Sequence, residues 1–141
     1  MQLNSLLQHI SYKSLQGNKE LFIKDISYHS QKVTQSSLFV CIKGQKTDGH
    51  DYVQQALEKG ASAVVVEERT LLSAGGKNLL YTKTGSIRIE DIIHNYGAAV
   101  VVVQDGRIAL AELSAAFFDF PAKKMKMIGI TGTKGKTTTA F

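Results

Sequence analysis

Glycines, lysines and threonines cluster near the end of this chain in a pattern that could bind phosphate. The loop Gly132-Thr133-Lys134-Gly135-Lys136-Thr137 directly follows an apolar stretch, residues 125–131, that predicts a β-strand. Glycine lets backbone N–H groups approach an anion closely, and a helix beginning after the loop adds N–H groups of its own. A strand, a glycine-rich loop, Gly-Lys-Thr and a helix start are together typical of a nucleotide-binding loop.

The side chains of this loop indicate ATP and magnesium chemistry. Lys136 would bring positive charge to the β- and γ-phosphates, which makes it the candidate catalytic residue, and the Thr137 hydroxyl would ligate Mg²⁺. Ile130 occupies the first glycine position of the general pattern, so Gly132 and Gly135 form the shorter G-x-x-G-K-T. The alternative is a Gly- and Thr-rich turn with incidental lysines, but it leaves the preceding strand unexplained.

Composition indicates an ordinary globular chain of 141 residues, 43% of them hydrophobic and one of them proline. The net charge of +5 could indicate nucleic-acid binding, but the lysines are scattered and their one cluster, residues 123–126, leads into the loop's strand. The longest apolar run, residues 98–103, is too short to cross a bilayer, and no signal-peptide pattern begins the chain. Cys41 lies in an apolar run that predicts burial. We expect a cytoplasmic protein without nucleic-acid or membrane partners.

Hydrophobic periodicity predicts an α/β fold, with a small, mostly parallel sheet and flanking helices over residues 1–120. The predicted strands cover residues 21–27, 38–42, 61–66 and 100–103, and the predicted helices cover residues 2–10, 51–59, 87–96 and 107–118. Strand, helix and strand over residues 38–66 form a βαβ unit, which favours a parallel pair.

The limits of this domain are predicted from breaks in the pattern. Residues 70–97 are the least regular part of the chain. The last helix is expected to end before Pro121, because proline disfavours helical geometry in the residue before it. Residues 119–124 would then form a linker, and residues 121–141 would begin a second, ATP-binding domain.

Taken together, these segments resemble the Mur ligase family. Residues 131–139 look like its ATP loop, which has the same short glycine spacing. Residues 37–44, 48–52 and 60–66 look like its UDP-sugar-binding N-terminal domain, and residues 105–107 look like the segment leading into that domain's last helix. The resemblance covers most of the chain and is nearest to the branch that adds the third residue to UDP-N-acetylmuramoyl-L-alanyl-D-glutamate in peptidoglycan synthesis.

The resemblance implies a reaction and a set of site residues. The first domain would bind the UDP end of the substrate, and the next would use ATP and Mg²⁺ to phosphorylate the free carboxylate of the UDP-N-acetylmuramoyl dipeptide. The amine of an incoming amino acid would then attack the acyl phosphate and form an amide. The residues implied for ATP are Gly132, Thr133, Lys134, Gly135, Lys136, Thr137 and Thr138, and those for the UDP-sugar are Ser30, Gln45, Lys46 and Thr47.

The chain departs from the family pattern near the UDP-sugar residues. The family usually has Asp-Ser-Arg where this chain has His29-Ser30-Gln31, and glutamine does not replace the rigid set of donors of arginine. Ser36 stands where a turn glycine is usual, and Gly106 stands where serine is common. The missing arginine favours one alternative, a non-catalytic UDP-sugar-binding module. A second alternative is another Mur-type or folylpolyglutamate-type ligase, because the ATP loop is shared by all of these enzymes.

The sequence gives weaker indications of function for the other polar residues. The four histidines have no metal-binding spacing, and His50 fits a substrate loop or a structural role about equally. Glu67 and Glu68 are expected to cap a strand at the surface. The family's metal-holding carboxylates and its amino-acid-binding domain would lie beyond Phe141, so we expect no ligase activity from the 141-residue chain alone.

Overall fold

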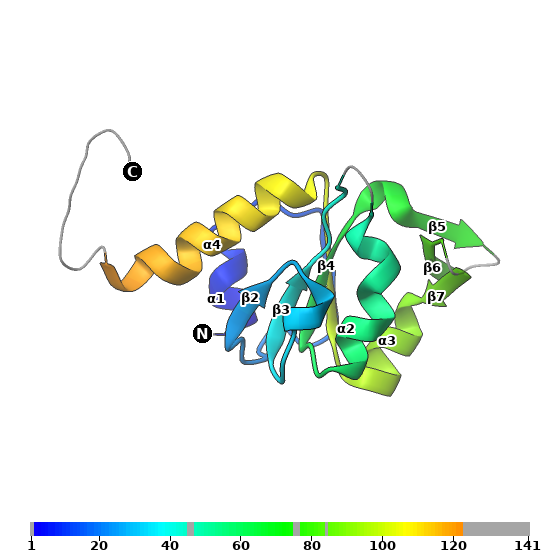
Figure 1. The fold of residues 1–141 in the computed structure, drawn as a ribbon, viewed down its shortest axis with the longest axis horizontal. Coiled ribbons are helices and arrows are strands. Elements are labelled where there is room, and N and C mark those ends of the chain that lie inside the picture. The colour runs from blue at the N-terminus through cyan, green and yellow to red at the C-terminus, as the bar shows by residue number, and fades with distance from the viewer. Residues whose placement is uncertain (1, 45–46, 75–76, 84, 123–141) are drawn as a thin grey trace.

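A five-stranded sheet forms the centre of the computed structural model, which describes residues 2–44, 47–74, 77–83 and 85–122 (Figure 1). Four of its strands are parallel, and β1 pairs antiparallel with β8 at one edge. The strands, in spatial order, are β1 (Ser14–Gln16), β8 (Ala99–Val103), β4 (Ala63–Glu67), β3 (Ser37–Val40) and β2 (Asp25–Ser27). The predicted mostly parallel α/β fold, including the β3–β4 parallel pair, is confirmed.

Helices cover both faces of this sheet. α1 (Leu3–Leu7) and α4 (Gly106–Ala122) pack on one face, and α2 (Val53–Glu58) and α3 (Ile89–Tyr96) pack on the other (Figure 1). Successive strand residues point to opposite faces, so Phe39 joins the α2–α3 core while its neighbours Leu38 and Val40 join the α1–α4 core. Because these strands are buried on both faces of the sheet, their sequences are continuous runs of apolar residues.

A second, three-stranded antiparallel sheet occupies much of the irregular stretch 70–97. It consists of β5 (Leu71–Ala74), β6 (Lys77–Thr82) and β7 (Gly85–Arg88). Leu80 of β6 is fully buried in the α2–α3 core, and Lys83 N–H donates to the Asp51 carboxylate at 2.7 Å. The small sheet is therefore attached to the domain through the core and also through the segment that leads into α2.

Several element limits differ from those predicted. α1 is shorter than residues 2–10 and β2 is shorter than residues 21–27, while β1 was not predicted. α4 continues to Ala122, so the predicted helix end before Pro121 is wrong, and residues 119–122 of the predicted linker over residues 119–124 are helical instead. Pro121 lies within the helix although it has no N–H to donate to the helical ladder. Residues 123–141, with the predicted ATP loop, lie outside the described residues, so the second domain stays a prediction.

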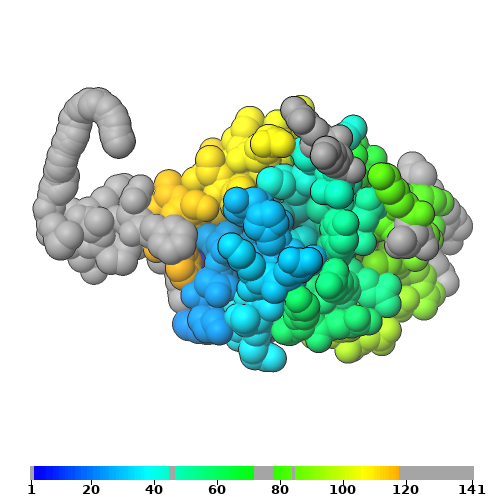
Figure 2. Space-filling model, viewed as in Figure 1, coloured from blue at the N-terminus to red at the C-terminus, as the bar shows by residue number. Residues whose placement is uncertain are grey.

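The carboxyl ends of the parallel strands gather beside the start of α4. In the space-filling view the first turns of α4 (yellow) lie at the upper edge, and the far end of this helix extends past the sheet (Figure 1 and Figure 2). Three short 3-10 helices follow strand ends or loops on this side, namely η1 (Ser30–Lys32), η2 (Gly49–Tyr52) and η3 (Glu68–Thr70). Within the described residues, no helix combines the length and apolar character needed to cross a membrane.

Candidate functional site

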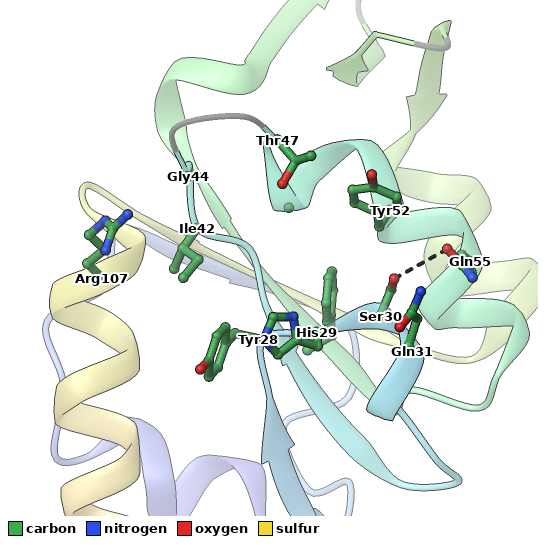
Figure 3. A pocket seen from close by; sticks show the side chains of 12 residues that line it. Tyr28, His29, Ser30, Gln31, Ile42, Gly44, Thr47, Tyr52, Gln55 and Arg107 are labelled. Carbon is green, nitrogen blue, oxygen red and sulfur yellow. Dashed lines mark hydrogen bonds between the residues drawn. The ribbon is translucent and has the colours of Figure 1, made fainter.

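A pocket of about 490 Å³ lies at the carboxyl ends of β2 and β3 (Figure 3). Its walls are the segment after β2, the segment after β3, η2 with the start of α2, and the first turn of α4. The lining residues are Tyr28, His29, Ser30, Gln31, Phe39, Ile42, Gly44, Thr47, Gly49, Tyr52, Gln55 and Arg107. Open α/β sheets bind ligands at the carboxyl ends of their strands, and this volume is in the usual range for a small-molecule site.

Two of the four predicted UDP-sugar residues lie in this pocket. Ser30 begins η1 and is 9% exposed, and its Oγ donates to Gln55 Oε1 of α2 at 3.3 Å. Thr47 lies across the pocket from it, in the loop after β3 (Figure 3). The other two, Gln45 and Lys46, lie outside the described residues, next to Thr47 in the chain.

Local hydrogen bonds fix both segments that carry these residues. After β2, Ser27 Oγ donates to the His29 carbonyl at 2.9 Å and accepts from the His29 N–H at 3.3 Å. After β3, the Gly44 N–H donates to the Thr47 carbonyl and the Gly49 N–H donates to the Ile42 carbonyl, each at 2.8 Å. Ser30 and Thr47 are therefore held by local turns at the ends of neighbouring strands.

Aromatic rings contribute flat surfaces to the pocket. The rings of Tyr28 and His29 have centroids 4.4 Å apart and are tilted by 38°. Tyr52 of η2 lies on the opposite side of the pocket and remains partly exposed (Figure 3). Exposed aromatic faces of this kind can stack on a planar heterocycle such as a nucleobase.

Arg107, which the sequence did not mark as a site residue, supplies positive charge to the pocket. It lies in the first turn of α4, and its guanidinium donates to the Lys43 carbonyl at 3.0 Å. Among the described lining residues it alone has a permanent positive charge. Gln31, at the family's arginine position, lies on the opposite rim (Figure 3). The sequence offered no signal for this role, because Arg107 reaches the pocket only through the packing of α4.

Four polar side chains, Asp48, His50, Glu67 and Arg69, form a cluster beside the pocket residue Gly49. We call it the Glu67 cluster. His50 is 1% exposed, and its Nε2 accepts from the Glu67 N–H at 2.9 Å. The proton of the neutral ring is then on Nδ1, which donates to Asp48 Oδ1 at 2.6 Å. The structure gives His50 a structural role and does not place it among the residues that line the pocket.

Glu67 is buried, so the prediction that it caps a strand at the surface is wrong. It is 8% exposed, its Oε2 accepts from the Gly106 N–H at 2.7 Å, and its Oε1 accepts from Arg69 Nε at 2.7 Å. The N-terminus of a helix stabilises a nearby negative charge, which helps to offset the burial. Glu68, the next residue, is exposed as predicted and lies 3.5 Å from Lys13 Nζ.

Burial and charge shift the pKa values of several groups in and near this cluster. Burial alone raises the pKa of Asp48, but hydrogen bonds from His50 and Arg69 outweigh it and lower the pKa to about 2. Burial lowers the pKa of Arg69, but its contacts with Asp48 and Glu67 outweigh that effect and raise it. The buried Cys41 thiol has a raised pKa because of desolvation and of the charges on Asp48 and Glu67. Cys41 therefore stays a protonated core residue, as predicted.

A second hollow, of about 570 Å³, lies on the other side of the first turn of α4. It is lined by Ser11, Val103, Gln104, Asp105, Ile108, Ala109 and Glu112. None of the predicted UDP-sugar residues that the structure describes lies there, and its two carboxylates would repel a diphosphate. The pocket at β2 and β3 is therefore the better candidate for an anionic ligand.

Related proteins agree with this fold and with the family predicted from the sequence. Residues 22–118 match the family described as "Mur ligase family, catalytic domain". The whole chain is 38% identical to the UDP-N-acetylmuramoyl-L-alanyl-D-glutamate--2,6-diaminopimelate ligase of Clostridium perfringens (strain 13 / Type A), of which it covers 25%. A ligase of the same name from Clostridioides difficile (strain 630) is 34% identical over 98% of the chain, which covers 24% of that protein.

A solved structure supports the same fold. The UDP-N-acetylmuramoylalanyl-D-glutamyl-2,6-diaminopimelate--D-alanyl-D-alanyl ligase from Acinetobacter baumannii aligns with 82% of this chain at a TM-score of 0.52 and 22% identity, over 21% of its own length. The present chain spans about a quarter of the length of the relatives it matches. Because the family match extends over most of its residues, the chain belongs to the Mur ligase family.

Proposed function

We propose that residues 1–120 bind the UDP end of a UDP-N-acetylmuramoyl dipeptide, as the first domain of an ATP-dependent ligase of peptidoglycan synthesis. The observation that carries the proposal is one pocket that brings together Ser30, Thr47 and Arg107 at the carboxyl ends of two parallel strands. The names of the relatives support diaminopimelate as the amino acid that the whole enzyme would add.

The chemistry of the pocket suits a uridine diphosphate. Uracil presents an N–H donor between two carbonyl acceptors, and the Ser30 hydroxyl and the Gln55 amide can pair with both kinds of group. Tyr28 and Tyr52 offer ring surfaces for a planar base. The Arg107 guanidinium matches the oxygens of a diphosphate and forms charge-assisted hydrogen bonds with them.

The ligase step would be carried out in the next domain, beginning near residue 121. ATP and Mg²⁺ would be bound by Gly132, Thr133, Lys134, Gly135, Lys136, Thr137 and Thr138, which lie outside the described residues. The substrate carboxylate would accept the γ-phosphoryl group with release of ADP, and the amine would then displace phosphate to form the amide. Binding of the remote UDP group would help to orient the carboxylate for this reaction.

Calorimetry with UDP tests the proposed site. We expect the 141-residue chain to bind UDP, and Ser30→Ala to weaken that binding by about tenfold, the usual effect of one lost hydrogen bond in a buried site. The matched control is Ser114→Ala, because Ser114 lies in the middle of α4 and outside the pocket.

Two results would contradict the proposal. One is an unchanged chain that binds no UDP at millimolar concentration, and the other is a Ser30→Ala variant that binds UDP as tightly as the Ser114→Ala control. The alternative of a non-catalytic UDP-sugar-binding module shares the binding result. It differs in predicting no ATP-dependent phosphate release from a longer protein that includes the second domain.

A further inference from the structure

We propose that Glu67 is a positioning residue, which fixes the start of α4 and thereby holds Arg107 at the pocket. Its effect would be on affinity for the diphosphate part of the ligand and not for the nucleoside part. The inference rests on the proposed UDP-binding function and adds a residue that does not line the pocket.

The first step of the argument is the direct link from Glu67 to α4. Glu67 ends β4, and its Oε2 accepts from the N–H of Gly106, the first residue of α4, at 2.7 Å. Arg107 is the next residue, and its guanidinium donates to the Lys43 carbonyl at 3.0 Å. The residue before Arg107 is therefore anchored on Glu67, the Arg107 N–H itself donates to Asp105 Oδ1 at 2.8 Å, and the tip of the Arg107 side chain is anchored on the loop after β3.

The second step is that the Glu67 cluster holds the same loop. Arg69 Nε donates to Glu67 Oε1 at 2.7 Å, and its NH2 group donates to Asp48 Oδ2 at 3.0 Å. Asp48 Oδ1 accepts from His50 Nδ1, and His50 Nε2 accepts from the Glu67 N–H, which closes a ring. The ring joins the end of β4, which holds the start of α4, to the loop that leads into η2.

The third step is that the stability of the fold does not by itself require a buried carboxylate at position 67. Replacing buried charged groups with apolar ones is often neutral or stabilising. The segments that Glu67 joins are those that carry Thr47 and Arg107 on two sides of the pocket (Figure 3). A cation that is already in place before binding does not lose conformational freedom when the ligand arrives, which increases affinity.

The test is a double-mutant cycle in the 141-residue chain, read by calorimetry with UDP and with uridine. Its four members are the unchanged chain, Glu67→Gln, Arg107→Ala and the double variant. Glutamine keeps the size of the glutamate side chain but cannot accept from both Gly106 and Arg69, because its NH2 group is a donor. The matched control is Glu68→Gln, which changes the exposed neighbour.

We expect Arg107→Ala to weaken UDP binding by about tenfold or more, and Glu67→Gln to weaken it several-fold, because a charge-assisted hydrogen bond is lost or misplaced. In the Arg107→Ala background, Glu67→Gln should have no further effect on UDP affinity. Uridine affinity should be the same in all four proteins, and Glu68→Gln should bind UDP like the unchanged chain.

The proposal would be overturned if the effects of Glu67→Gln and Arg107→Ala on UDP affinity were fully additive in the double variant. It would also be overturned if Glu67→Gln weakened uridine binding as much as it weakens UDP binding. If the unchanged chain binds neither UDP nor uridine, the proposed function fails and this inference fails with it. Thermal unfolding of each protein shows whether it is folded. If Glu67→Gln does not fold, Arg69→Gln replaces it in the cycle, since it opens the same ring from the partly exposed side.

Discussion

At the scale of single residues, the sequence predicted only some of the residues that line the candidate pocket. The family resemblance pointed to Ser30 and Thr47, and the structure brings both to one pocket. Arg107 and Gln55 were not predicted, because each reaches the pocket from a helix whose packing the sequence pattern does not reveal. The resemblance also drew attention to Ser36, where a glycine is usual. The structure gives it a φ of 70°, which is rare for a residue with a side chain.

We expect Ser36→Gly to stabilise the protein by about 0.5–1 kcal/mol, because relief of left-handed strain exceeds the added freedom of glycine in the unfolded chain. The turn itself should persist, since the Ser36 N–H donates to the Gly60 carbonyl at 2.9 Å. Urea unfolding measures the change. The control is Ser86→Gly in β7, which should destabilise instead, and a Ser36→Gly variant less stable than the original would contradict the prediction.

At the scale of elements, the start of α4 is fitted closely against the ends of β3 and β4. A Cβ atom on Gly106 would overlap the Cys41 carbonyl oxygen and would also lie 3.3 Å from Glu67 Oε2. We expect Gly106→Ala to destabilise the fold by about 1–3 kcal/mol, the usual effect of overpacking, and to weaken UDP binding because Arg107 must move. Thermal unfolding and calorimetry measure the two effects.

The control for this substitution is Gly97→Ala at the C-cap of α3. Gly97 has a φ of 65°, but no atom lies within 4 Å of its added Cβ, so only backbone strain of about 1 kcal/mol is expected. UDP binding should be unchanged in this variant, because Gly97 does not line the pocket. A Gly106→Ala protein that keeps both the original stability and the original UDP affinity would show that α4 does not depend on this close contact.

At the scale of the whole molecule, the Glu67 cluster should make stability depend on pH in the acid range. The pKa of Asp48 is lowered from its usual 3.8 to about 2, so its contribution is fully present above about pH 5 and is lost as pH falls through about 2. Because the side chain is partly exposed and solvent screens its interactions, we take the corresponding free energy as about 1 kcal/mol. We expect Asp48→Asn to reduce stability at pH 7 by about this amount and to flatten the acid dependence, as measured by urea unfolding between pH 2 and 7.

The control for the pH prediction is Asp91→Asn in α3. Asp91 pairs with Arg88 at the surface, where an ion pair contributes little, so this variant should keep the acid dependence of the unchanged protein. Equal pH profiles for Asp48→Asn and the unchanged protein would show that the cluster does not control acid stability.

The sequence by itself determined the main architecture and the family. β3, β4 and β8 were predicted as buried strands because each is a continuous apolar run, which is what a sheet covered on both faces requires. β1 was missed because three residues carry too little periodicity to be separated from a turn, and β5, β6 and β7 were missed because their mixed polar and apolar residues form neither a continuous apolar run nor a regular alternation. The length of α4 was missed because the prediction rested on the local preference of the residue before Pro121, and the structure continues the helix through that proline.

Only the tertiary structure decided the environment of the charged residues. Glu67 lies 39 residues from Gly106, and Arg107 lies 64 residues from Lys43, yet each pair is joined by a hydrogen bond. Hydrophobic periodicity reports which side of an element faces the core, since it depends on neighbours in the chain. The burial of a carboxylate and the direction of a guanidinium depend instead on partners that are distant in the sequence, so they were settled only when the packing of α4 against the sheet was known.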